Sequence, residues 1–152
     1  MVIGIAADHG GFELKEKIKS LLQDKGFSIQ DFGAHHLDPK DDYPDFVGPL
    51  AAAVSKQQVA RGIAICGSGV GASIVANKFK DVRAALITET YSARQGVEHD
   101  ALNIICLGGR VVGEELAKEL IEAFLAAEYT GEERHNRRLG KLKSMEDDAF
   151  KA

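Results

Sequence analysis

Five short apolar runs recur along the chain, and each has the pattern of a buried β-strand. They cover residues 2–6, 27–32, 62–66, 83–88 and 103–108. Most of them are continuously apolar rather than alternating, which is typical of parallel strands that are covered on both faces. The pattern therefore predicts a five-stranded parallel sheet.

The segments between these runs carry apolar residues at helical spacing. Residues 11–26 gather their apolar side chains on one side of a helix, and Gly26 suits the helix end. Residues 42–58 place Pro44 near a helix start, although Gly48 and Pro49 oppose a regular helix. Further helices are predicted within residues 71–79, 90–99 and 113–128. This alternation of strands and helices predicts an α/β domain with right-handed crossovers.

The strand order predicts where a ligand would bind. Five doubly wound strands most simply take the order 2-1-3-4-5, whose switch point lies between the carboxyl ends of the first and third strands. Those ends carry Asp8-His9-Gly10-Gly11 and Cys66 to Gly71. We therefore expect one Rossmann-like, three-layer αβα domain over residues 1–152, with a helical extension from about residue 131 and a binding crevice at these strand ends.

Composition narrows the class of protein. The 152 residues are 45% apolar and carry a formal net charge of −4, which argues against nucleic acid as a partner of the whole surface. No apolar stretch approaches the roughly 18 residues of a membrane span, and the first residues lack the basic start of a signal peptide. We expect a cytoplasmic protein without a membrane partner. Its two cysteines, 40 residues apart, suggest neither a zinc site nor a disulfide.

A cysteine stands directly before a glycine-rich loop. Glycines at positions 67, 69 and 71 allow consecutive N–H groups to point at an anion near a helix start. The same dipoles would lower the pKa of the Cys66 thiol, so that it acts as a base or a nucleophile. The alternative is a small buried side chain before an ordinary turn. Cys106 lies inside an apolar strand and is interpreted as a core residue.

Several histidines and arginines are further candidates. Asp8 and His9 fit either a solvent-facing helix start or a site opposite the cysteine, and His99 fits a helix end. Arg134 and Arg138 are one helical turn apart and could hold one phosphate together, which favours a small phosphorylated substrate over a polyanion. His35 and His36, in a polar loop, are interpreted as solvated.

Taken together, the segments "AADHGGFELK", "DYPDF", "ICGSGVGASIVANKF", "VRAAL", "YSA", "EH", "LGGRVVG" and "ERHNRR" resemble the type B ribose-5-phosphate isomerase family. That family also contains allose-6-phosphate, galactose-6-phosphate and erythrulose-phosphate isomerases. The resemblance covers essentially the whole chain, in order. It implies an aldose-ketose isomerase with no metal and no cofactor, whose active sites are shared between the subunits of a homodimer or a dimer-based tetramer.

The resemblance also implies roles for individual residues. Cys66 would be the base that moves a proton between C2 and C1 of the sugar through a cis-enediolate. The glycine loop would stabilise the oxyanion through the backbone of Gly67, Gly69, Val70 and Gly71, at roughly 3 kcal/mol per donor. Ser68 would relay a hydroxyl proton.

The remaining roles concern ring opening and phosphate binding. By the same resemblance His99 opens the furanose ring together with Asp8. The resemblance implies that His9, Arg134 and Arg138 bind the phosphate group, with Arg110 as a weaker candidate. Tyr43 either lines the substrate site or is an ordinary packed aromatic residue.

One position departs from the family pattern. The family usually has His-Asn where this chain has His99-Asp100. An asparagine amide donates a hydrogen bond, whereas an ionised aspartate only accepts one and adds a repelling charge. Asp100 therefore points away, is held protonated, or contacts a hydroxyl of another sugar, and the substrate is open between ribose 5-phosphate and other sugar phosphates.

Two other classes of function are compatible with a cysteine at a glycine loop. In a sugar-transport phosphocarrier, Cys66 would accept a phosphoryl group, and such a protein has no need of Asp8, His99 or the arginines of the tail. A sugar-phosphate sensor would bind the ligand without turnover. The isomerase hypothesis uses all of these residues, and we prefer it.

Overall fold

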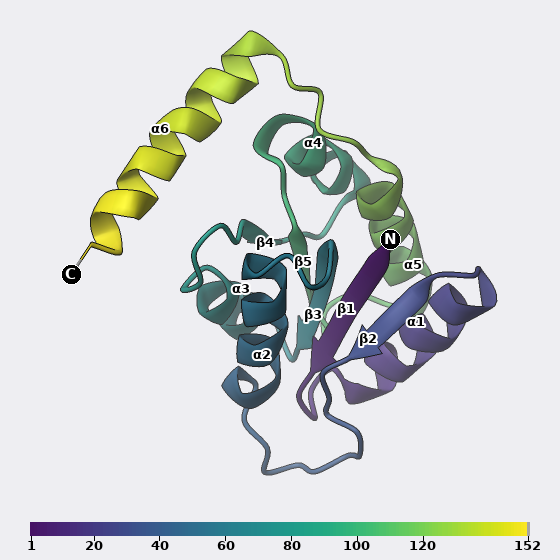
Figure 1. Cartoon of the computed structure of the whole chain (residues 1–152). Helices are drawn as coiled ribbons and strands as arrows, with labels where there is room; N and C mark the ends of the chain where they lie inside the picture. Colours follow the sequence, from purple (N-terminus) through teal and green to yellow (C-terminus); the bar gives the residue numbers. More distant parts are fainter. Residues whose placement is uncertain (152) are drawn as a thin grey trace.

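The computed structural model describes residues 1–151, which form a sheet flanked by helices on both faces (Figure 1). The strands are β1 (Val2–Ala7), β2 (Ser28–Asp31), β3 (Arg61–Cys66), β4 (Ala84–Leu86) and β5 (Ile104–Gly108). The helices are α1 (Phe12–Asp24), α2 (Pro44–Ser55), α3 (Val70–Ala76), α4 (Thr90–Asp100), α5 (Glu114–Ala126) and α6 (Glu133–Ala149). All strand pairs are parallel, so the predicted α/β class is confirmed.

Two apolar layers hold the helices against the sheet. On one face, Ile3 and Ile5 of β1 pack with apolar side chains of α1, α4 and α5. On the other face, Ala64 and Cys106 pack with α2 and α3. Because successive side chains of a strand point to opposite faces, the continuously apolar strands supply both layers. The three-layer αβα architecture is therefore as predicted.

The strands lie in the order β2-β1-β3-β5-β4, so the predicted order 2-1-3-4-5 is wrong at one side of the sheet. β5 is buried along its whole length and pairs with both β3 and β4. β4 has only three residues, and all of them are at least partly exposed. A short, exposed strand suits a sheet edge, and the fully apolar β5 therefore takes the interior position.

The corrected order keeps the expected switch point. β1 still pairs with β3, with Ala7 opposite Ile65. β5 now also pairs with β3, with Cys66 opposite Gly108. The carboxyl end of β5 therefore joins those of β1 and β3 at the same edge of the sheet.

α2 is a continuous helix despite Gly48 and Pro49, and α6 is the helical extension that the sequence predicted. α2 continues through Pro49, and the nearby Val47 and Leu50 of the same helix are fully buried. α6 extends away from the sheet in Figure 1, and most of it is exposed, although His135 is buried. Within residues 1–151, no helix combines the length and apolar character that crossing a membrane requires.

Candidate active site

The turns that follow β1, β3 and β5 pack directly against one another. Gly109 N–H donates to the carbonyl of Cys66 at 2.7 Å, and Arg110 N–H donates to the carbonyl of Gly67 at 3.0 Å. A Cβ on Gly10 would lie 2.8 Å from the nitrogen of Gly67, so the two backbones approach more closely than a side chain allows. The three strand ends thus form one continuous backbone surface.

Cys66 lies at the centre of this surface. It ends β3, is 4% exposed, and its Sγ accepts a hydrogen bond from Gly69 N–H at 3.1 Å. Gly69 has a φ of 84°, and a Cβ there would lie 2.9 Å from the carbonyl carbon of Leu107. Glycine is therefore required at this position, and its conformation directs an amide dipole at the sulfur atom.

The rest of the glycine loop is more accessible. Ser68 and Val70 are exposed, and Val70 N–H donates to Ser68 Oγ at 3.3 Å. Gly71 lies against the ring of Tyr43, because an added Cβ would be 2.7 Å from Tyr43 Cζ. Tyr43 is 36% exposed, so it packs on the loop and also presents part of its ring to solvent.

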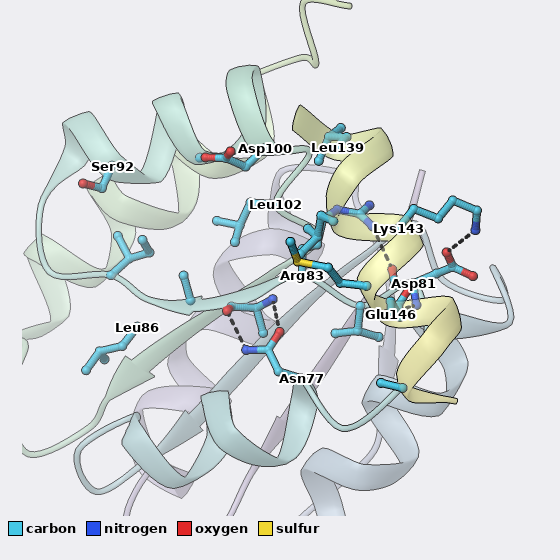
Figure 2. A pocket seen from close by; sticks show the side chains of 18 of the residues that line it. Asn77, Asp81, Arg83, Leu86, Ser92, Asp100, Leu102, Leu139, Lys143 and Glu146 are labelled. Atoms are coloured by element: carbon cyan, nitrogen blue, oxygen red, sulfur yellow. Dashed lines mark hydrogen bonds and ion pairs between the residues drawn. The ribbon is translucent and has the colours of Figure 1, made fainter. Parts of the chain in front are cut away.

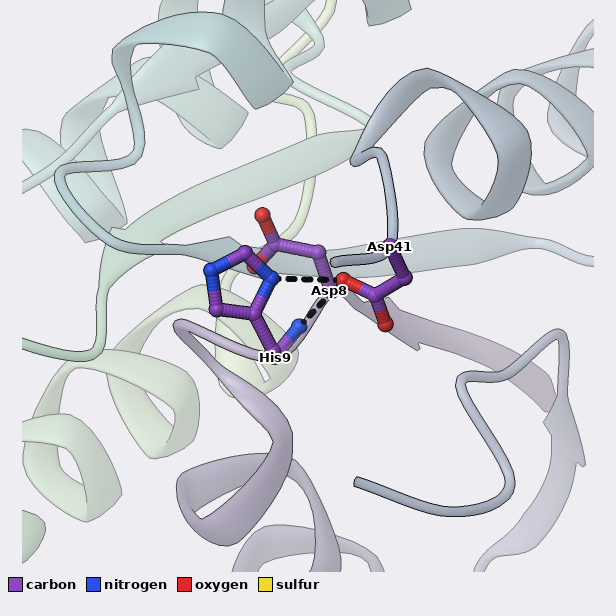
Figure 3. A group of neighbouring side chains, drawn as sticks. All are labelled: Asp8, His9 and Asp41. Carbon is purple, nitrogen blue, oxygen red and sulfur yellow. Dashed lines mark hydrogen bonds and ion pairs between the residues drawn. The ribbon is translucent and has the colours of Figure 1, made fainter. Parts of the chain in front are cut away.

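Asp8 and His9 follow β1, the strand that pairs with β3, and so lie next to the cysteine turn. Asp8 is buried, and its Oδ1 accepts a hydrogen bond from Gly10 N–H at 2.9 Å. His9 is held by Asp41, whose Oδ1 lies 2.9 Å from His9 N and 2.6 Å from His9 Nδ1 (Figure 3). The hydrogen bond to Asp41 has the largest effect and raises the pKa of His9; burial opposes it, the charge of Asp8 adds to the rise, and Arg110 has a smaller lowering effect.

Asp8, His9 and Asp41 are residue types that also occur together as metal ligands. Asp8, His9 and Asp41 each offer one ligand atom, and these atoms lie within 4.8 Å of one another. However, His9 Nδ1 and Asp41 Oδ1 are 2.6 Å apart in a hydrogen bond, which a metal ion would have to break. The arrangement fits a proton between these two atoms better than a metal ion.

A second group of predicted site residues gathers around the end of α4. His99 and Asp100 are the last residues of α4, and Arg134 and Arg138 lie on the first two turns of α6. The rings of His99 and His135 stack with centroids 4.1 Å apart. Gln95 Nε2 lies 3.0 Å from His99 Nδ1.

Burial gives this group its electrostatic character. The side chain of His135 is 1% exposed, and burial lowers its pKa, with further lowering by His99 and Arg134. Arg134 is exposed and pairs with Glu132 at 3.0 Å. The end of α4 therefore presents two stacked imidazole rings beside exposed cationic side chains, and burial favours the neutral form of the His135 ring.

The two groups lie at opposite ends of the strands: the second group is near the amino end of β5, and the cysteine turn is at the carboxyl ends of β3 and β5. α4 ends at Asp100, three residues before β5 begins, whereas Cys66 pairs with Gly108 at the end of β5. Five residues of strand span roughly 15 Å. His99 and Cys66 of the same chain are therefore far apart. The residues that the sequence predicted for a single site form two separate groups in one chain.

A groove of about 980 Å³ opens beside the second group (Figure 2). It separates α6 from β4 and the end of α4, and its lining includes Leu86, Leu102, Leu139 and Leu142. An ion pair of Lys143 with Asp81 at 3.3 Å bridges α6 to the body of the molecule. The groove is thus mainly apolar and lies away from the cysteine turn.

Sequence reasoning missed three contacts in these groups. Asp41 reaches His9 across 32 positions, and Gln95 and His135 hold His99 from two elements. Asp41 stands in an acidic loop without periodicity, and His135 stands within a run of arginines, so neither had a distinguishing pattern. Other predictions held: His35 and His36 are exposed.

Cys106 also matches its prediction as a core residue. It is 0% exposed, and burial, with a smaller effect of Cys66, raises the pKa of its thiol. The two thiols therefore have different surroundings, since Cys66 receives an amide hydrogen bond at the surface of the strand ends.

The chain is similar to known proteins in both sequence and structure. Residues 3–142 match the model of the Ribose/Galactose Isomerase family. Ribose-5-phosphate isomerase B of Escherichia coli is 41% identical over 95% of each chain, and D-erythrulose-4-phosphate isomerase of Pectobacterium atrosepticum is 42% identical over 85% of each chain. The crystal structure of ribose-5-phosphate isomerase B from Mycoplasma genitalium with bound ribulose-5-phosphate superposes with a TM-score of 0.92, at 39% identity over 97% of each chain.

These similarities extend over the sheet, the glycine loop and most of α6, at identities well above those at which only the fold is shared. They agree with the family that the motifs of the sequence indicated. The chain belongs to the ribose/galactose isomerase family, among the relatives of the type B ribose-5-phosphate isomerases, and it is an isomerase.

Proposed function

We propose that this sugar phosphate isomerase interconverts ribose 5-phosphate and ribulose 5-phosphate, with Cys66 as the base. The observation that carries the proposal is the hydrogen bond from Gly69 N–H to Cys66 Sγ, at the point where three strand ends meet. A thiolate there takes the proton from C2 of the open-chain aldose and returns it to C1. The intermediate is a cis-enediolate.

The glycine loop supplies the electrostatic part of the reaction. Negative charge develops on the substrate oxygens as the C2 proton leaves. Backbone N–H groups of Gly67, Val70 and Gly71 stabilise that charge, at about 3 kcal/mol for each well-placed donor. Ser68, which is exposed on the loop, carries the proton between the O1 and O2 hydroxyl groups.

Ring opening and phosphate binding combine residues of the cysteine turn with residues of the second group. His99, with Asp8, transfers the protons that open the furanose ring. His9, Arg110, Arg134 and Arg138 bind the phosphate group, since arginine forks match phosphate oxygens. Because His99 and Cys66 of one chain are separated by the length of the sheet, these roles require a second copy of the chain.

We therefore propose a homodimer, alone or within a tetramer, in which each site takes Cys66 from one subunit and His99 from the other. Exposed apolar side chains support this assembly. Val70 and Ile74 of α3 are 48% and 56% exposed, and Leu142 and Met145 of α6 are 47% and 68% exposed. Light scattering should give the mass of at least two chains.

Asp100 and the erythrulose-phosphate relative favour a second candidate substrate class, another sugar phosphate of four or six carbons. A phosphocarrier role for Cys66 would leave the residues at the end of α4 without a function. The cytoplasmic location stays a prediction.

The test is proton NMR of ribose 5-phosphate, erythrulose 4-phosphate, allose 6-phosphate and galactose 6-phosphate in deuterated buffer, each with purified protein and no added metal. We expect ribulose 5-phosphate to form fastest, with solvent deuterium at C1 of the ketose and, after the reverse reaction, at C2 of the aldose. If another sugar phosphate is converted faster, that sugar phosphate is the substrate and the assignment to ribose 5-phosphate is wrong. No conversion of any of them would refute the proposed function.

A further inference from the structure

The His9–Asp41 pair joins two segments that are far apart in the sequence. Asp41 lies between β2 and α2, and a turn closed by Asp41 N–H donating to Asp38 O at 3.1 Å holds it in place. One oxygen of Asp41 accepts hydrogen bonds from both the backbone N–H and the Nδ1 of His9. The Asp41 side chain is 9% exposed and that of His9 is 28% exposed, so the contact is shielded from water on the carboxylate side.

The chemistry of the pair fixes which nitrogen of His9 carries a proton. An ionised carboxylate only accepts hydrogen bonds, so the short Nδ1–Oδ1 contact requires a proton on Nδ1. Nε2 lies on the far side of the ring from Asp41 (Figure 3). Protonation of His9 therefore adds its proton at Nε2, which then becomes a donor for an anion outside the pair.

The charges around His9 act on that protonation. Asp41 and Asp8 favour the cation, and Arg110 and partial burial oppose it, with a net rise of the pKa. These groups come from the segments that follow β1, β2 and β5. The pKa of His9 depends most on Asp41, since the hydrogen bond to Asp41 has the largest effect on it.

We propose that Asp41 is a positioning residue that acts through His9, holding the imidazole with Nδ1–H on the carboxylate and Nε2–H toward the phosphate group of a bound sugar. This inference rests on the proposed function insofar as His9 meets the phosphate group. Asp41 also stands two residues before Tyr43, whose ring contacts Gly71. The segment from Asp41 to Tyr43 therefore links the His9 turn to the glycine loop.

The first experiment needs no substrate. The ring nitrogens of ¹⁵N-labelled His9 are titrated by NMR in Asp41→Asn, with Asp42→Asn as the matched control, because Asp42 is an exposed carboxylate at the next position. Asparagine keeps an acceptor but loses the charge. We expect the pKa of His9 to fall in Asp41→Asn and to stay unchanged in Asp42→Asn. A His9 titration in Asp41→Asn that equals the control would overturn the inference.

The second experiment separates positioning from general structural support. Asp41→Asn should raise the KM for ribose 5-phosphate about tenfold near pH 8, the effect of losing one charged hydrogen bond, with a smaller change in kcat. In a His9→Gln background the same substitution should have no further effect on KM. Independent, additive losses would overturn the inference. Absence of turnover in the unmodified protein would instead refute the proposed function, whereas the NMR titration tests the pair separately.

Discussion

His99 stacks on His135 with ring centroids 4.1 Å apart, at the edge of the sheet opposite the one where Cys66 ends β3. The stack joins the end of α4 to the start of α6, and Arg134 and Arg138 extend from the same turns of α6. This relationship divides the candidate site of one chain into a cysteine half and a histidine-arginine half. The proposed isomerase therefore needs a site that takes one half from each of two chains.

Replacing Cys66 by alanine should lower turnover of ribose 5-phosphate at least about 100-fold, because it removes the proposed base that exchanges the C2 proton. Binding of the sugar phosphate, measured by calorimetry, should be kept. The matched control is Cys106→Ala, since this second thiol is buried in β5 and should matter for packing alone. Near-normal turnover of Cys66→Ala would remove the cysteine from the base role.

Replacing His99 by asparagine tests ring opening. The variant should slow the isomerisation of ribose 5-phosphate, which is mainly cyclic, far more than that of erythrose 4-phosphate, which cannot close the same furanose ring. Initial rates on both sugars measure the difference. Equal losses on the two substrates would speak against a ring-opening role for His99.

Replacing Asp100 by asparagine should raise kcat/KM for ribose 5-phosphate several-fold. The amide donates a hydrogen bond to the enediolate and lacks the charge that repels a phosphorylated substrate. The comparison is made with the four sugar phosphates in parallel. If the substitution leaves ribose 5-phosphate unchanged but impairs another sugar, Asp100 belongs to the recognition of that sugar.

The buried His135 predicts a dependence of stability on pH. Its pKa is lowered from 6.5, so the unfolded chain binds the proton more readily than the folded one. The contribution of His135 to stability is therefore complete above pH 6.5 and is lost as the pH falls through the folded-state pKa. His9, with a raised pKa, acts in the opposite direction, losing its contribution as the pH rises.

Urea unfolding at about pH 7.5 and about pH 5.5 measures this effect. The His135→Phe variant keeps an aromatic ring for stacking on His99 and removes the titrating group. It should lose less stability on acidification than the unmodified protein. An equal loss in both proteins would show that His135 is not the group responsible.

The sequence predicts the fold better than it predicts the assembled site. Continuous apolar runs give the strands and their parallel arrangement, since burial on both faces demands such runs. The order of β4 and β5 was missed because five alternating units fit two orders equally well, and the choice depends on the length and exposure of β4.

The candidate site shows the same limit at the level of residues. Cys66, Gly69 and Asp8 were found because polar or glycine residues interrupt apolar strands at their ends. Asp41 and His135 were missed because their partners lie far away in the sequence and become neighbours only through packing. That His99 lies far from Cys66 follows from topology, which residue types and spacing do not reveal.

The most direct test of the shared site is complementation between two inactive variants. Cys66→Ala and His99→Asn are purified separately, mixed, unfolded in urea and refolded together. A mixed dimer has one site with both substitutions and one with neither, so random pairing should restore about a quarter of the activity of the unmodified protein. A refolded mixture as inactive as its two parents, with mixed dimers present by native mass spectrometry, would contradict the account of an isomerase site built from two chains.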